Sequence, residues 1–156
     1  MKILIDGDAC SKKDTVIKLA KKYNIPVHIY CDVNHNIDDD YADIFIVDCE
    51  SNSADFAIAN HIETDDIVVT NDIGLATMAM AMRGRPINNY GTIYTSRNIG
   101  KYINHKYMIK ASIRKQRNTN HHSNLPKNPK PKQSFYASLL YLIRKTRKKD
   151  MQYQAS

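Results

Sequence analysis

The stretch 3-ILIDGDAC-10 begins with three apolar residues and then places Asp6 and Asp8 on either side of Gly7. An apolar run of this length predicts a buried strand, which we expect over Lys2–Asp6. Gly7 lets the backbone turn tightly between the two acids. The stretch therefore predicts a strand that delivers carboxylates at its carboxyl end.

A second stretch, 68-VVTNDIGLA-76, repeats this arrangement farther along the chain. Asp72 follows an apolar strand and stands where a helix begins. Asp55 lies early in another expected helix, Ser53–Ile62, with Phe56, Ala59 and Ile62 turned inward. In an open parallel sheet, ligands bind outside the carboxyl ends of the strands. We therefore expect acids from distant parts of the chain to meet at one sheet edge.

The remaining pattern alternates short apolar strands with amphipathic helices. Ser11 and Asp14 have the spacing of a capping box, which predicts a helix that ends at Asn24. The further expected elements are strands at Pro26–Tyr30, Ile44–Val47, Ile67–Thr70 and Pro86–Asn88, a polar loop at 32–42, and a helix from Asp72 to about Met82 that Gly84 stops. This alternation predicts an α/β protein with a mostly parallel sheet covered by helices.

The C-terminal part differs in composition. We expect basic helices at about 96–104 and 107–116, and then a proline- and asparagine-rich linker at 117–133. Apolar residues recur on one side of a last helix, Ser134–Lys149, which should dock on the body. The predicted organisation is an α/β domain over 1–116, the linker, and a docking helix at 134–149.

Converging carboxylates need a cation or a raised pKa. Two unit charges about 5 Å apart repel by roughly 3 kcal/mol at an effective dielectric near 20. A hard divalent cation such as Mg²⁺ or Mn²⁺ would relieve this repulsion and could activate water against a phosphoryl group. Taken singly, Asp72 could be only a helix N-cap, Asp8 could make an Asx-turn, and Asp55 could favour the positive end of its helix.

Charge is sharply divided along the chain. The net charge is +7, but residues 1–72 hold 15 Asp and Glu against 6 Lys and Arg, whereas residues 73–156 hold 17 Lys and Arg against one acid. A basic half attracts polyanions. The cations that we expect to contact nucleic acid are Arg97, Lys101, Lys106, Lys110, Arg114 and Lys115. Tyrosines interleave with them, as in single-strand stacking platforms or on half-buried helix faces.

Other classes are disfavoured. No stretch approaches the roughly 18 apolar residues of a membrane span, and the first residues lack the apolar core of a secretory signal. Cys10, Cys31 and Cys49 show no CxxC spacing, which is more typical of reduced thiols than of a disulfide framework. We therefore expect a cytoplasmic protein with no membrane partner.

Several motifs, in order, resemble one known family. Asp6–Cys10, Ala54-Asp55, Val68–Ala76 and the run from Asn88 to Thr95 are similar to the bacterial YaiI/YqxD family of uncharacterised proteins, which look related to PIN-like nuclease domains. The similarity covers about residues 1–145. The resemblance implies a PIN-like three-layer α/β/α sandwich with a basic helical extension, and an acidic nuclease-type centre.

Carried over by motif, Asp6 and Asp72 match the most dependable acidic positions, with Asp8 and Asp55 as further contributors. This suggests a metal-dependent nuclease for RNA or single-stranded nucleic acid. Asp6, Asp55 and Asp72 would hold Mg²⁺ or Mn²⁺, and Asp8 would ligate it or position water. Asn52 stands where a further acid is expected, which favours the alternative of an RNA-binding protein with a degenerate site. An aspartyl phosphatase with Asp6 as nucleophile and Asp8 as general acid is a third hypothesis.

Overall fold

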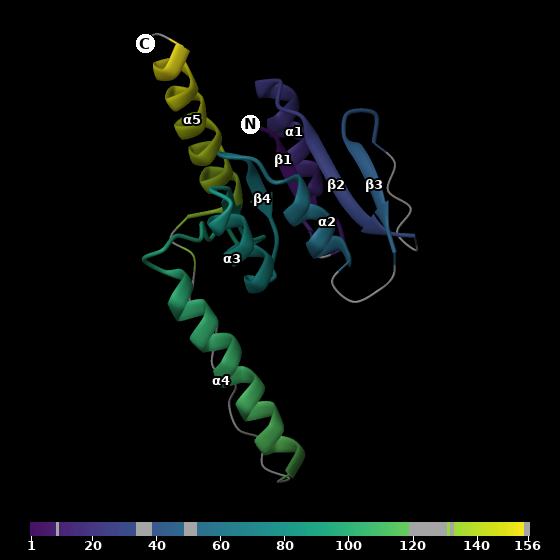
Figure 1. The fold of residues 1–156 in the computed structure, drawn as a ribbon, viewed down its shortest axis with the longest axis vertical. Helices are drawn as coiled ribbons and strands as arrows, with labels where there is room; N and C mark the ends of the chain where they lie inside the picture. The colour runs from purple at the N-terminus through teal and green to yellow at the C-terminus, as the bar shows by residue number, and fades with distance from the viewer. Residues whose placement is uncertain (9, 34–38, 49–52, 119–130, 132, 155–156) are drawn as a thin grey trace.

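The computed structural model describes residues 1–8, 10–33, 39–48, 53–118, 131 and 133–154. Its elements in chain order are β1 (Ile3–Asp6), α1 (Lys13–Tyr23), β2 (Val27–Asp32), β3 (Asp43–Val47), α2 (Ser53–His61), β4 (Ile67–Val69), α3 (Ile73–Ala81), β5 (Arg85–Ile87), α4 (Ile99–Asn118) and α5 (Phe135–Gln154). The five strands form one sheet in the order β3-β2-β1-β4-β5, and every pair is parallel (Figure 1). The predicted α/β class with a parallel sheet is confirmed.

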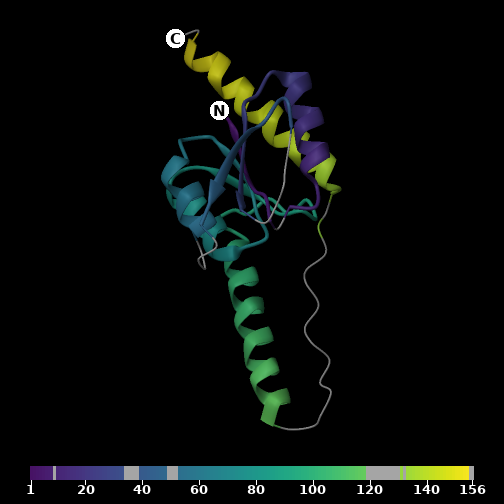
Figure 2. The ribbon, with the colours of Figure 1, turned by 90° about the vertical axis from the view of Figure 1, so that its right-hand side faces the viewer.

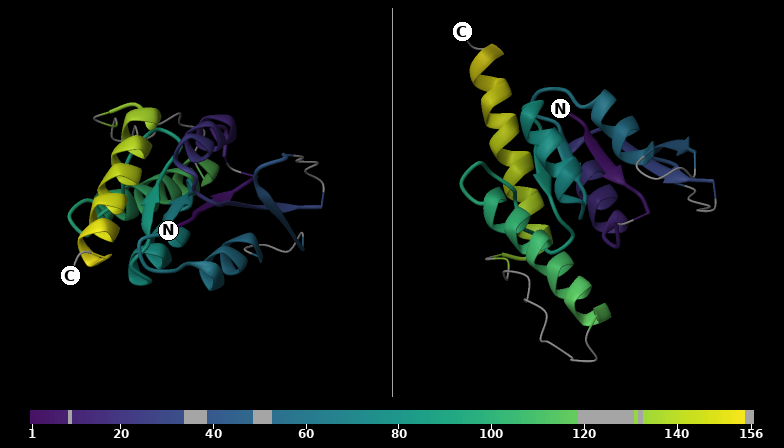
Figure 3. Two further views of the ribbon diagram at one scale, coloured as in Figure 1. Left: turned by 90° about the horizontal axis from the view of Figure 1, so that it is seen from above. Right: turned by 60° about the horizontal axis from the view of Figure 1, so that its bottom comes forward.

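Successive side chains of β1 point to opposite faces of the sheet, which identifies the helices on each face. Ile3 and Ile5 pack with α1 and α5, whereas Leu4 packs with α2 and α3 on the other face. Figure 3 shows these helices on opposite sides of the strands. The expected three-layer α/β/α arrangement is therefore present.

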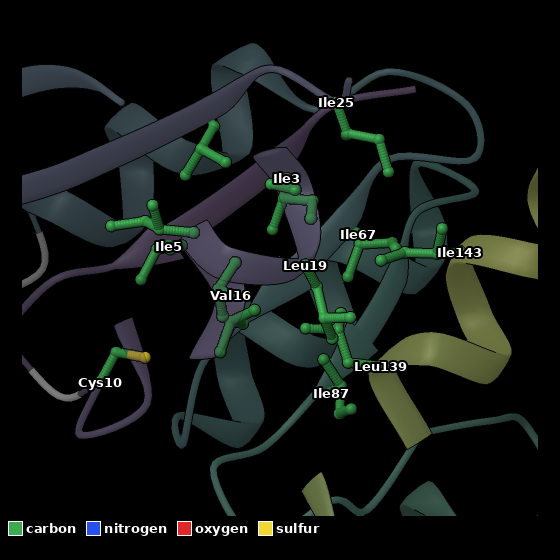
Figure 4. Packing of buried hydrophobic residues seen from close by; sticks show 14 of the residues in the cluster. Ile3, Ile5, Cys10, Val16, Leu19, Ile25, Ile67, Ile87, Leu139 and Ile143 are labelled. Carbon is green, nitrogen blue, oxygen red and sulfur yellow. The ribbon is translucent and has the colours of Figure 1, made fainter. Parts of the chain in front are cut away.

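The C-terminal helix α5 completes the first face. Phe135, Leu139, Leu142 and Ile143 are buried in one cluster with residues of β1, β4 and α1. Figure 4 shows Leu139 and Ile143 of α5 beside the strand residues Ile67 and Ile87. Burial of a large aliphatic side chain contributes about 1.5–3 kcal/mol, so this stripe is a substantial part of the core. Helix α4, by contrast, runs away from the sheet (Figure 2). No described helix is both long and apolar enough to cross a membrane.

Three local predictions were wrong. Helix α1 is preceded by Lys12 without a side-chain cap, so Ser11 and Asp14 do not form the expected capping box. Phe56 is 63% exposed, because α2 turns Ile58, Ala59 and Ile62 to the sheet instead. The two helices expected at 96–104 and 107–116 are one continuous α4.

Other boundaries differ less. Helix α5 runs to Gln154, beyond the predicted end at Lys149. Asn24 ends α1 in the left-handed conformation, with φ 50°, as expected. Most of the predicted linker, as well as Cys49 and Asn52, lies outside the described residues. Cys10 and Cys31 are both buried, and neither forms a disulfide.

Candidate metal centre and basic helix

The acidic residues lie where the sheet changes direction. From β1 the chain passes through α1, on one face of the sheet, to β2 on one side of β1. From β4 it passes through α3, on the other face, to β5 on the side of β4 away from β1. The neighbouring carboxyl ends of β1 and β4 therefore form a topological switch point, where open α/β sheets bind their ligands. Asp6 ends β1, and Asp72 follows β4 by three residues.

Asp6 and Asp72 are joined through Thr70. Asp6 is only 8% exposed, and its Oδ2 accepts a hydrogen bond of 3.1 Å from the Thr70 hydroxyl. The same hydroxyl oxygen accepts from the backbone N–H of Asp72 at 3.0 Å. Thr70 thus fixes the spacing between the two acidic segments. Sequence reasoning missed this role, although Thr70 directly follows the β4 apolar run.

Asp72 is the N-cap of α3, as the simpler interpretation predicted. Its Oδ1 accepts from the backbone N–H groups of Gly74 and Leu75, the latter at 3.1 Å. Its Oδ2 accepts from Lys106 Nζ at 3.1 Å. Burial raises the pKa of Asp72, but the hydrogen bonds from Lys106 and the two backbone N–H groups together hold it below its usual range. Asp72 is thus a stable carboxylate.

Asp55 approaches the same edge from α2. It lies three residues before the buried Ile58, on the side of the helix that faces the sheet. Burial raises the pKa of Asp55, and the negative charges of Asp72 and Asp6 raise it further, whereas Lys106 lowers it. Three elements therefore bring Asp6, Asp55 and Asp72 within electrostatic reach of one another.

Asp8 lies toward β2. Gly7 precedes it, and the Gly7 N–H donates to the carbonyl of Tyr30 at 2.7 Å. A side chain at Gly7 would place its Cβ at 2.7 Å from that carbonyl oxygen, so the turn requires glycine in this backbone. Asp8 Oδ1 accepts weakly from the Asp32 backbone N–H at 3.4 Å. Asp32, at the end of β2, is an acid that sequence reasoning had assigned to a loop.

The carboxyl oxygens are the donors that Mg²⁺ and Mn²⁺ prefer. Within the residues that the structure describes, no three His, Cys, Asp or Glu side chains are grouped closely enough to hold a metal ion. The carboxylate oxygens are suitable ligands for a hard cation. The described acidic side chains, however, lie too far apart for three of them to coordinate one ion directly. Lys106 supplies the positive charge at Asp72 instead.

Most of the predicted nucleic-acid contacts lie on α4. Lys106, Lys110 and Arg114 recur every four residues and therefore follow one side of the helix. Lys101, Lys110 and Arg114 are exposed, as is Arg97 in the turn before α4. Lys115 is part of α4, but its side chain lies outside the described part of the structure. Lys106 therefore brings this row of cations to Asp72, and the row continues along α4 away from the sheet.

The tyrosines of this region divide into two groups. Tyr94 is buried and packs edge-on against Tyr102, with ring centroids 5.1 Å apart, so these rings are structural. Tyr107, on α4, is 68% exposed. It is accessible to a ligand.

Comparison with known proteins agrees with the resemblance stated above. The family described as "Uncharacterized BCR, YaiI/YqxD family" matches residues 4–145. A UPF0178 protein of Alkaliphilus oremlandii is 39% identical over 130 residues, covering 83% of this chain and 82% of the relative. One from Clostridium tetani is 33% identical over 150 residues, covering 95% and 100%. No solved structure matches the chain.

Proposed function

Because this chain belongs to the YaiI/YqxD family, whose description assigns no activity, we propose its function from the site: a divalent-metal-dependent nuclease that acts on RNA or single-stranded nucleic acid. One observation carries the proposal. The Thr70 hydroxyl donates to Asp6 Oδ2 and accepts from the backbone N–H of Asp72, which holds these two acidic segments side by side at the switch point of the sheet. The pKa of Asp55, raised first by burial and then by the charges of Asp72 and Asp6, supports a third acid nearby. The relation to PIN-like domains, expected from the motifs, belongs to this proposal.

The acids have distinct roles in this proposal. Asp6 and Asp72 hold the cation, and Asp55 completes or orients the set. Asp8, on the side of β2, positions water. When bound, Mg²⁺ or Mn²⁺ supplies Lewis-acid stabilisation of the charge that develops on a phosphoryl oxygen. The cations of α4 hold the phosphodiester backbone in place beside this centre.

Lys106 links the two halves of the proposed site. Its ammonium group pairs with Asp72. A phosphate of the strand competes for this ammonium, and a metal ion competes for the carboxylate. A phosphate bound at Lys106 would therefore leave Asp72 Oδ2 available to a metal ion.

The decisive experiment compares the wild-type chain with the double variant Asp6→Asn/Asp72→Asn on labelled single-stranded RNA. Asn retains the helix-capping ability of Asp72, so α3 should persist. We expect cleavage by the wild type with Mn²⁺, loss of cleavage in EDTA, and no metal-dependent cleavage by the variant. Equal cleavage by the two proteins would exclude the nuclease.

A second candidate is an RNA-binding protein whose acidic centre has lost metal binding. The ion pair between Lys106 and Asp72, with no three acids closely grouped among the described residues, favours it. Titration with Mn²⁺ separates the two functions. A working centre gives a saturable rise in Tm that Asp72→Asn removes, whereas a degenerate centre gives none.

A further inference from the structure

A groove lies beside Asp72, between α3 and the first half of α4. Its volume is about 470 Å³, within the range of small-molecule sites. The lining residues that matter here are Thr77 and Met78 from α3 and Ile103, Lys106, Tyr107 and Lys110 from α4. We propose that this groove binds one nucleotide of a single strand, with the base on its apolar part and the phosphate at its lysines.

The apolar part suits a base. Met78 and Ile103 are partly buried and present aliphatic surface, while the exposed ring of Tyr107 has room for a base to stack on it. Bases stack on aromatic side chains in single-strand binders with little sequence preference, because every base has a π-face. The groove therefore favours an unpaired strand over a duplex, whose bases are already stacked.

The charge of the groove selects the same ligand. Residues 99–118 contain six Lys and Arg and no Asp or Glu. Lys110 is exposed one helical turn beyond Lys106, which already holds the carboxylate of Asp72 at 3.1 Å. An anion at these lysines would lie next to the acidic edge. A nucleotide in the groove thus places its phosphate beside the proposed metal centre, and the inference rests in this respect on the proposed function.

Binding measured in EDTA tests the base contact without cleavage. The probe is a labelled six-nucleotide RNA, followed by fluorescence anisotropy, and a matched strand with abasic sugars is the second ligand. We expect Tyr107→Ala to weaken binding of the normal strand by about fivefold to a hundredfold, from the cost of losing one stacked base. The abasic strand should bind the variant and the wild type equally. Tyr107→Phe should retain the affinity.

Two controls make the result specific. Tyr136→Ala removes another half-exposed tyrosine, on α5, and should leave binding unchanged. Lys110→Ala should weaken both strands alike and reduce the salt dependence by about one phosphate contact. Equal losses for Tyr107→Ala and Tyr136→Ala, or an equal loss on the abasic strand, would overturn the proposal. So would displacement of the strand by adenosine monophosphate at the same concentration, which would indicate a free-nucleotide site.

The outcome is separate from that of the nuclease test. A chain that binds bases through Tyr107 but does not cleave RNA with Mn²⁺ keeps this subsite and loses the proposed activity. A chain that cleaves RNA while Tyr107→Ala binds normally keeps the activity and loses the subsite.

Discussion

Replacing Lys106 by Met should strengthen metal binding at Asp72. The ammonium lies 3.1 Å from Asp72 Oδ2, so a divalent ion on that carboxylate would sit about 5 Å from a positive charge. Coulomb repulsion at that distance is about 1.7 kcal/mol even at the dielectric constant of water. Lys106 and Asp72 are 43% and 39% exposed, and salt and rotation of the lysine reduce this further. We expect about threefold to tenfold tighter Mn²⁺ binding.

Isothermal titration with Mn²⁺ measures this change directly, without nucleic acid. Lys110→Met is the matched control, because it removes the same charge one turn farther from Asp72 and should alter the affinity by less than about twofold. NMR titration of Asp72 gives a second measurement: losing the Lys106 hydrogen bond should raise the pKa of that carboxyl. If Lys106→Met weakens Mn²⁺ binding, or if both variants strengthen it equally, Asp72 is not a ligand in the way we propose.

Three further predictions concern stability. Asp72→Ala should lower the unfolding free energy by about 1 kcal/mol through loss of the α3 cap, and Asp72→Asn by less; urea unfolding measures both, and equal losses would contradict the capping role. Leu139→Ala should cost about 2–5 kcal/mol, because Leu139 is fully buried, and a loss below 1 kcal/mol would mean that α5 is not part of the core. Burial raises the pKa of Asp65, but its bonds with Lys149 and Arg85 outweigh burial and lower that pKa below the ordinary 3.8. The stability that the Asp65 carboxylate contributes is therefore complete above pH 3.8 and is lost as the pH falls through the lowered pKa. Asp65→Asn should therefore flatten the acid limb of the stability curve, and an unchanged limb would refute this.

The acidic edge was predictable because its signals are local. Asp6 and Asp72 each follow an uninterrupted apolar run, and parallel strands share one carboxyl edge. The alternation of strands and helices likewise predicts the parallel sheet. Strand order could not be read in this way, because it depends on contacts between segments far apart in the sequence.

The failures arose where two local patterns fit equally well. In α2, one stripe through Phe56, Ala59 and Ile62 and another through Ile58, Ala59 and Ile62 both have helical spacing, and only packing on the sheet selects the second. The second stripe also carries Asp55 to the sheet side.

Long-range polar pairs had no sequence signal. Lys106 and Asp72 are 34 residues apart, and Thr70 and Asp6 are 64 residues apart. Asp66 and Lys2 are likewise 64 residues apart, and the fully buried Asp66 carboxylate pairs with Lys2 Nζ at 2.9 Å. Such pairs form only after the fold brings distant elements together.

Helix α5 has a consequence for how the polypeptide matures on the ribosome. The strands of the sheet and α1–α4 are synthesised before it, yet the core cluster that Ile3 and Ile5 form with α1 is complete only when Leu139 and Ile143 arrive. Until then, a nascent chain carries an uncovered apolar surface together with a cationic helix, beside the ribosome's own RNA. Folding of this face should therefore wait until α5 has been synthesised.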